Sequence, residues 1–95
     1  MITLYGMSSS GNCYKLQLAC AQLGIDHAWE EIDITRGENL SPEFLAMNDR
    51  GKVPVLKHAD GHTLAESNAI LHYLAEGSAL LPDDRWARAK TLQWM

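Results

Sequence analysis

The chain has 95 residues, of which 46% are hydrophobic, and this suits one compact domain with a modest core rather than two domains. Its formal net charge of −4 at pH 7 offers no reason to bind nucleic acid or an anionic membrane surface, because both attractions need clustered basic residues. No segment has the length of a signal-peptide core or a membrane span, so we expect a cytoplasmic protein.

The first third of the chain predicts a βαβ unit. Residues 2–5 form a short β-branched and aromatic run closed by Gly6, which indicates a buried strand. A serine-rich turn follows, and we then expect a helix over residues 12–23, because apolar residues recur at helical spacing up to a glycine suited to a C-terminal cap. Ile32 and Ile34 alternate with acidic residues, which predicts a second strand, parallel to the first because a helix connects them.

The middle of the chain predicts a short helix, a β-hairpin and a third helix. Ser41, Pro42 and Glu43 supply the N-cap, the first-turn proline and the acidic residue of a helix start. Two apolar runs at 53–56 and 63–64 flank an Asp-Gly pair, which is typical of an antiparallel hairpin. The core-facing residues of the third helix are expected to be Ile70, Leu71, Tyr73 and Leu74. The element order βαβ-α-ββ-α predicts an α/β fold with a four-stranded mixed sheet.

Three segments are expected along the chain: residues 1–77 as the compact domain, 78–84 as a linker, and 85–95 as the first helix of an all-helical C-terminal domain. The last helix has neither a cap nor a stop signal at its end, and its Trp86 and Trp94 need an apolar partner. We therefore expect the natural chain to continue into further helices.

The serine-rich turn before the first helix is the first feature with possible chemistry. A helix N-terminus carries unpaired backbone N–H groups and a partial positive charge, and Ser8, Ser9 or Ser10 could donate a hydrogen bond to a ligand thiolate. Lowering a thiol pKa by about two units requires roughly 2.7 kcal/mol, which one charge-assisted hydrogen bond and the helix terminus can supply together. Spacing alone equally allows these serines to act only as helix caps.

Two further features point to a ligand with a peptide backbone. A proline at position 54 belongs at a sheet edge, where an extended peptide could pair with the backbone of Val53. Ser67 can cap the third helix and, with the first N–H groups, bind a carboxylate, while Glu66 can pair with an ammonium group. Together the three features describe a ligand with a thiol, an extended backbone and a free amino-acid end.

The chain resembles, over its whole length, the N-terminal domain of cytosolic glutathione transferases. Four segments carry the resemblance in the family's order and spacing: YG at 5–6, SGNCYK at 10–15, NDRGKVPVL at 48–56 and LAESNAI at 64–70. The resemblance implies a thioredoxin-like fold, and the similar classes are the bacterial serine-type, theta-like and zeta-like transferases.

The resemblance also implies roles for particular residues. Ser10 resembles the catalytic serine that stabilises the glutathione thiolate, with Ser8 and Ser9 as weaker candidates. Val53 resembles the residue whose backbone pairs with the cysteine of glutathione, and Pro54 resembles the family's cis-proline.

Glu66 and Ser67 correspond to the residues that bind the γ-glutamyl group, Lys52 could reach the glycyl carboxylate, and Asn12 could orient the ligand or cap the first helix. Glutathione is then the co-substrate, no metal is expected, and the partner is a small electrophile. The full-length protein is expected to be a homodimer whose helical C-terminal domain supplies most of the electrophile pocket.

Other functions remain open at this point. A thiol-disulfide oxidoreductase is the main alternative, but Ser10 occupies the first position of the C-x-x-C redox motif and Cys13 falls within the helix. A noncatalytic module for protein contacts, an isomerase and a dehalogenase are also compatible with the family. Cys13 and Cys20 are too far apart to form a disulfide and are expected to be free thiols. Scattered histidines give no metal-binding pattern: His27, His58, His62 and His72.

Overall fold

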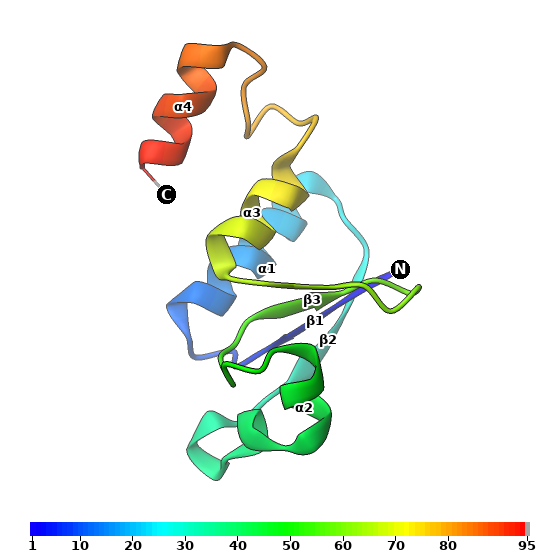
Figure 1. Cartoon of the computed structure of the whole chain (residues 1–95). Coiled ribbons are helices and arrows are strands. Elements are labelled where there is room, and N and C mark those ends of the chain that lie inside the picture. The colour runs from blue at the N-terminus through cyan, green and yellow to red at the C-terminus, as the bar shows by residue number, and fades with distance from the viewer. Residues whose placement is uncertain (95) are drawn as a thin grey trace.

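The computed structural model describes residues 1–94 and has a four-stranded mixed sheet at its centre (Figure 1). The strands lie in the order β2-β1-β3-β4, with β2 parallel to β1 and the other neighbours antiparallel. Their bounds are β1 Ile2–Gly6, β2 His27–Glu31, β3 Val55–Lys57 and β4 Thr63–Ala65. The predicted mixed sheet is therefore confirmed.

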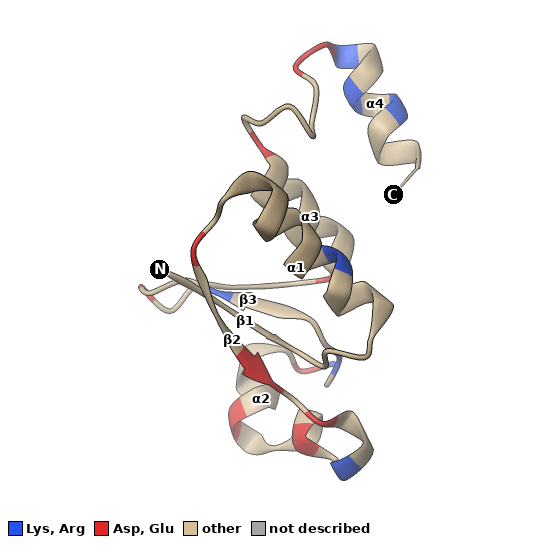
Figure 2. Ribbon diagram, turned by 180° about the vertical axis from the view of Figure 1, so that it is seen from behind, with Lys and Arg blue, Asp and Glu red and all other residues tan. Residues whose placement is uncertain are grey.

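Helices lie on both sides of this sheet. The α-helices are α1 (Gly11–Leu23), α2 (Pro42–Met47), α3 (Ser67–Ala75) and α4 (Arg85–Gln93), with short 3-10 turns η1 (Ile34–Arg36) and η2 (Glu38–Leu40) before α2. Views from the front and from behind show α1 and α3 packed together over one face, with α2 on the other side (Figures 1 and 2). This is the expected thioredoxin-like arrangement.

The core lies between the sheet and the pair α1 and α3. Leu4 at the centre of β1 pairs in register with Leu56 of β3, and both are buried. One apolar cluster joins the sheet to both helices: Leu4, Leu16, Cys20, Leu56, Ile70 and Leu74. Burying this set stabilises the fold because apolar area leaves water, at about 25 cal/mol per Å². The cluster thereby holds the N-terminal ends of α1 and α3 in place.

Some local predictions were wrong. The second strand is His27–Glu31 rather than the region of Ile32 and Ile34, because the Asp33 side chain accepts a hydrogen bond from the Thr35 N–H at 3.0 Å and turns the chain into η1. Tyr73 is 46% exposed rather than in the core, and its hydroxyl bonds His58 Nε2 at 2.7 Å. At both places a hydrogen bond at the surface, rather than the spacing of apolar residues, decided the local structure.

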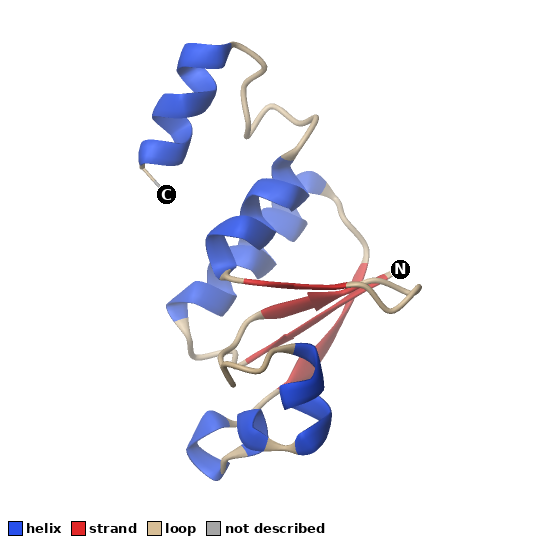
Figure 3. Cartoon of the chain, in the orientation of Figure 1, coloured by secondary structure: helices blue, strands red, loops and turns tan. Residues whose placement is uncertain are grey.

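The helix α4 stands apart from the sheet, beyond the segment that follows α3 (Figure 3). Asp84 caps it by accepting from the Ala87 N–H at 2.9 Å, and Arg88 forms an ion pair with Glu76 near the end of α3. Leu81, in the connecting segment, is buried. Across residues 1–94 no helix is long and apolar enough to cross a membrane.

Candidate functional site

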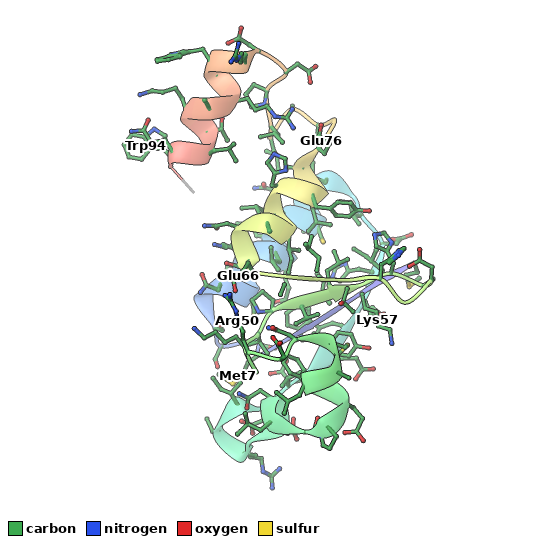
Figure 4. All side chains as sticks on the ribbon, viewed as in Figure 1. Met7, Arg50, Lys57, Glu66, Glu76 and Trp94 are labelled. Carbon is green, nitrogen blue, oxygen red and sulfur yellow. The ribbon has the colours of Figure 1, made fainter. Side chains whose placement is uncertain are left out.

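A small pocket opens where α1, the loop before β3 and the start of α3 meet. Its volume is about 160 Å³. Residues from three separate segments line it: Asn12, Asn48, Lys52, Val53, Pro54, Glu66 and Ser67. All of them except Asn48 were predicted from the sequence as ligand-binding residues. In Figure 4, Glu66 and Arg50 lie on the same side of the molecule, with Lys57 on the opposite side.

Asn48 shapes the loop that forms one wall of the pocket. Its side chain is buried, with 7% exposed, and its Nδ2 donates a hydrogen bond to the carbonyl of Lys52 at 2.9 Å. Its Oδ1 accepts from the Arg50 N–H at 3.3 Å, and Gly51 adopts φ 63°. These bonds fix the path of the backbone that presents Lys52 and Val53 to the pocket. This role of Asn48 was not predicted from the sequence.

The Val53–Pro54 peptide bond is cis, as the resemblance implies. Pairing in the sheet starts at Val55, so the prediction that the strand begins at residue 53 was wrong. Val53 lies outside the ladder, and its peptide groups are not used in strand pairing. An extended ligand backbone can therefore meet Val53 at the pocket wall.

Glu66 and Ser67 join β4 to α3. Glu66 is the N-cap of α3, with φ 75° and ψ 118°, and Ser67 is the first helical residue. The prediction that Ser67 caps the helix was therefore wrong. The Glu66 side chain makes no capping hydrogen bond, and the first N–H groups of an α-helix have no acceptor within the helix. They point their partial positive charge toward the pocket end of the helix.

Ser10 is the N-cap of α1, with extended backbone geometry. Its carbonyl accepts from the Tyr14 N–H at 2.9 Å, but its side chain makes no capping hydrogen bond. Asn12 lies inside α1 and lines the pocket, so the alternative that it caps the helix is wrong. Ser10 does not line the pocket itself, yet its Cα lies within about 7 Å of that of Asn12 along the chain.

The neighbouring serines differ from Ser10. The Ser8 hydroxyl donates to Glu31 Oε1 at 2.6 Å, and the Ser8 N–H donates to Glu31 Oε2 at 3.0 Å. Trp29 Nε1 donates to the same carboxylate at 2.9 Å. The hydrogen bond from the Ser8 hydroxyl, then those from Trp29 and the Ser8 backbone, lower the pKa of Glu31. Ser8 is thus engaged with Glu31, whereas Ser9 is exposed.

Both cysteines are free and buried, as predicted. Cys13 is fully buried beneath Gly6, where a Cβ on that glycine would lie 2.8 Å from the Cys13 sulfur. Burial raises the pKa of the Cys20 thiol. Thiol exchange requires an accessible thiolate, so neither cysteine is placed for it.

Residues 9–76 match the family model described as "Glutathione S-transferase, N-terminal domain". The chain belongs to the glutathione S-transferase family. A curated relative from this family, glutathione S-transferase 1 of Dianthus caryophyllus, is 40% identical over 93 residues, which cover 95% of this chain and 42% of the relative. The disulfide-bond oxidoreductase YfcG of Escherichia coli is 37% identical over 102 residues, covering all of this chain and 47% of that protein.

Solved glutathione transferase structures share the fold. A possible glutathione transferase from Rhodopseudomonas palustris has a TM-score of 0.94 and 54% identity, covering 98% of this chain and 46% of that one. A glutathione transferase homolog from Sulfitobacter, solved with bound glutathione, has a TM-score of 0.86 and 29% identity, covering 95% of this chain and 44% of that one. The present chain thus spans less than half the length of these relatives.

Proposed function

We propose that this chain is the glutathione-binding domain of a glutathione transferase, in which the Ser10 hydroxyl stabilises the glutathione thiolate for attack on a small electrophile. The single observation that carries the proposal is the pocket between α1, the loop before β3 and α3, because it gathers residues that the family resemblance assigns to one tripeptide. Family membership and the glutathione-bound homolog support the choice of ligand.

The charges around the pocket complement those of glutathione. The Glu66 carboxylate would pair with the α-ammonium of the γ-glutamyl group, and Ser67 with the open N-terminus of α3 would hold the α-carboxylate. Lys52 would attract the glycyl carboxylate. Backbone hydrogen bonds from Val53 would fix the cysteinyl residue between these two ends, while Asn12 orients it from α1.

The chemistry at the sulfur needs the thiolate. Glutathione loses its thiol proton to solvent, and the Ser10 hydroxyl donates to the sulfur near the N-terminus of α1. The sulfur lone pair then attacks the electrophilic carbon, so that a C–S bond forms and the leaving group departs with its electron pair. A hydrogen bond to a charged group contributes about 1.5–3 kcal/mol, which corresponds to a thiol pKa about one to two units lower.

The rest of the protein enters the proposal through its relatives. We assign residues 1–77 to the glutathione-binding domain, 78–84 to a linker and 85–95 to the start of a helical domain that supplies the electrophile pocket, although Met95 lies outside the described residues. The greater length of the relatives and the exposure of Trp86 and Trp94 on α4 support this division. We further propose a homodimer in the cytoplasm, where glutathione and the free cysteines stay reduced.

A thiol-disulfide oxidoreductase is the second candidate, because one similar relative carries the name of that activity. In that reaction the glutathione thiolate, rather than a protein cysteine, would attack one sulfur of the substrate disulfide, since Cys13 is buried. A mixed disulfide forms as the substrate S–S bond breaks, and the other sulfur leaves as a thiolate. The same pocket and the same serine would then serve a different electrophile, a disulfide sulfur. Turnover of an organic disulfide against that of an aryl halide separates the two functions.

The decisive experiment titrates glutathione into the full chain by calorimetry and follows thiolate absorbance in the ultraviolet, for the wild type, Ser10→Ala and Ser9→Ala. The proposal expects retained binding with loss of thiolate at neutral pH in Ser10→Ala alone. Ser9 is the matched control, because it is the adjacent exposed serine of the same turn. An unchanged thiolate signal in Ser10→Ala contradicts the role of Ser10, and absence of binding in the wild type contradicts the proposed ligand.

A further inference from the structure

Glu31 makes an unusual set of contacts for an exposed carboxylate. It ends β2, beside Gly6 in the register of β1, and accepts hydrogen bonds from the Ser8 N–H, the Ser8 hydroxyl and the Trp29 indole. Both carboxylate oxygens are occupied by donors from the protein. Two of the donors belong to a segment 23 residues earlier in the chain. An exposed acid is normally solvated, so three such bonds indicate a specific structural task.

The segment held by Glu31 is the serine turn, defined here as residues 7–10. Inside the turn, the Ser10 N–H donates to the Met7 carbonyl at 2.9 Å. Within residues 1–94, the side-chain hydrogen bonds that tie residues 7–9 to another element all go to Glu31. Ser10 is the residue at which this turn enters α1. The position of the Ser10 hydroxyl therefore depends on how firmly the turn is fastened.

Trp29 connects this fastening to the core. Its ring packs against the apolar cluster and lies over Gly6, where an added Cβ would come within 2.9 Å of ring atom Cη2. Because alternate residues of a strand face the same side, Trp29 and Glu31 project together, and the indole N–H reaches the carboxylate. A half-buried ring that packs on the core thus orients Glu31, and Glu31 orients the turn.

We propose that Glu31 is a positioning residue of the thiolate site: it clamps the serine turn through Ser8 and thereby places the Ser10 hydroxyl against the sulfur of the bound thiol. This inference rests on the proposed function of Ser10. It also assigns Ser8 and Ser10 different tasks. The Ser8 N–H and hydroxyl both donate to Glu31, whereas the Ser10 hydroxyl makes no capping hydrogen bond.

A positioning role of Glu31 and a simple effect of its charge predict opposite changes in the pKa of the bound thiol. A carboxylate near a developing thiolate raises the thiol pKa by repulsion, so removal of its charge alone would lower that pKa. In Glu31→Gln, however, one acceptor oxygen becomes an NH₂ group facing a donor of Ser8 or Trp29, and the clamp loses a bond. If Glu31 acts by positioning, the pKa of the bound glutathione thiol rises.

The test measures the thiolate absorbance of bound glutathione against pH in four variants of the full chain: Glu31→Gln, Ser10→Ala, the double variant and Glu30→Gln. Glu30 is the matched control, because it loses the same charge from the adjacent residue on the opposite face of β2. We expect Glu31→Gln to reduce the thiolate fraction at neutral pH about 3- to 10-fold, as a small misplacement of a catalytic group does. Glu30→Gln should match the wild type.

The double variant separates this inference from the proposed function. If Glu31 acts through Ser10, Glu31→Gln has no further effect on the thiol pKa once Ser10 is alanine. An unchanged or lowered pKa in Glu31→Gln, with the Ser10→Ala effect intact, overturns the positioning role alone. An unchanged pKa in Ser10→Ala overturns the proposed function. The indole N–H resonance of Trp29 reports whether the clamp opened in a folded chain, so a misfolded variant is recognised and replaced by Ser8→Ala, which removes only the hydroxyl donor.

Discussion

The four helices begin in two different ways. The helices α2 and α4 have side-chain caps, since Ser41 accepts from the Phe44 N–H at 3.1 Å and Asp84 accepts from the Ala87 N–H at 2.9 Å. The helices α1 and α3, whose N-terminal ends meet at the pocket, have no such side-chain bond within the described residues. The two helices without a side-chain cap are thus the two that border the pocket.

An open helix start carries a free-energy cost, because a good N-cap contributes about 1 kcal/mol. The ends of α1 and α3 are kept in place by the core instead, through Leu16, Cys20, Ile70 and Leu74. Glutathione offers a thiolate and the α-carboxylate of its γ-glutamyl group, which can use the exposed N–H groups. The capped pair therefore serves the stability of the fold, and we propose that the open pair serves the ligand.

The largest expected effect comes from Ser10→Ala. Because Ser10 makes no capping bond, the free energy of unfolding should stay within about 0.5 kcal/mol of the wild type. Loss of a hydrogen bond to the thiolate should instead lower the thiolate fraction of bound glutathione at neutral pH by about 10- to 100-fold. Urea unfolding and the ultraviolet absorbance of the thiolate measure the two quantities. A large loss of stability would show that Ser10 is a structural cap after all.

The substitution Ser41→Ala at the start of α2 should have the opposite effect to Ser10→Ala. Removing the acceptor of the Phe44 N–H should reduce the free energy of unfolding by about 1 kcal/mol. Glutathione affinity should not change, because Ser41 does not line the pocket. Urea unfolding and calorimetry check the two expectations, and Ser41→Thr, which retains the hydroxyl, is the control. If Ser41→Ala lost glutathione affinity but no stability, the proposed difference between the capped and the uncapped helices would be wrong.

A substitution of Glu66 tests how much the uncapped N-terminus of α3 lowers the stability of the chain. Its φ of 75° lies in a region that non-glycine residues occupy at a cost of about 1–3 kcal/mol. Glu66→Gly should therefore stabilise the chain by about 0.5–1 kcal/mol after the greater flexibility of glycine in the unfolded chain is counted. Calorimetry should at the same time find weaker glutathione binding, because the partner of the ammonium group is gone. Glu66→Gln, which keeps the strain and loses the charge, separates the two effects.

The smallest expected effect is the loss of stability at acidic pH when Glu31 is protonated. Hydrogen bonds from Ser8 and Trp29 hold the pKa of Glu31 below its ordinary value of 4.5, so the folded state favours the ionised form. Its stabilising contribution is complete above pH 4.5 and is lost as the pH falls through the lower folded pKa. The Trp29 indole N–H resonance should shift in that range and stay constant above it. A shift near neutral pH would exclude Glu31 as its partner.

Much of the fold could be predicted from the sequence because the patterns are local. Most elements were predicted to within a few residues of their observed bounds from glycine and serine at element ends, helical spacing of apolar residues and an Asp-Gly turn. Ser41 was identified correctly as a helix cap. The second strand was missed because the segment 27–31 ends in two adjacent acidic residues, while the apolar pair Ile32 and Ile34 imitates a strand.

The pocket residues were predictable for a different reason. Val53, Glu66 and Ser67 stand out by a proline, a helix start and a resemblance, all of which are visible in the chain. Asn48 and Glu31 were not predicted, since their partners are backbone groups or distant residues. A loop asparagine three residues before a glycine is the one local signal that could have identified Asn48.

The sequence by itself determined the element order and the mixed sheet, and it singled out candidate ligand-binding residues by their chemistry, because periodicity, turn chemistry and residue type act over a few positions. Only the tertiary structure decided which helix starts stay uncapped, that Ser8 is engaged by Glu31, and that Asn48 shapes the pocket wall. Each of these depends on which donor meets which acceptor across the folded chain, and such pairings depend on geometry that no local pattern contains.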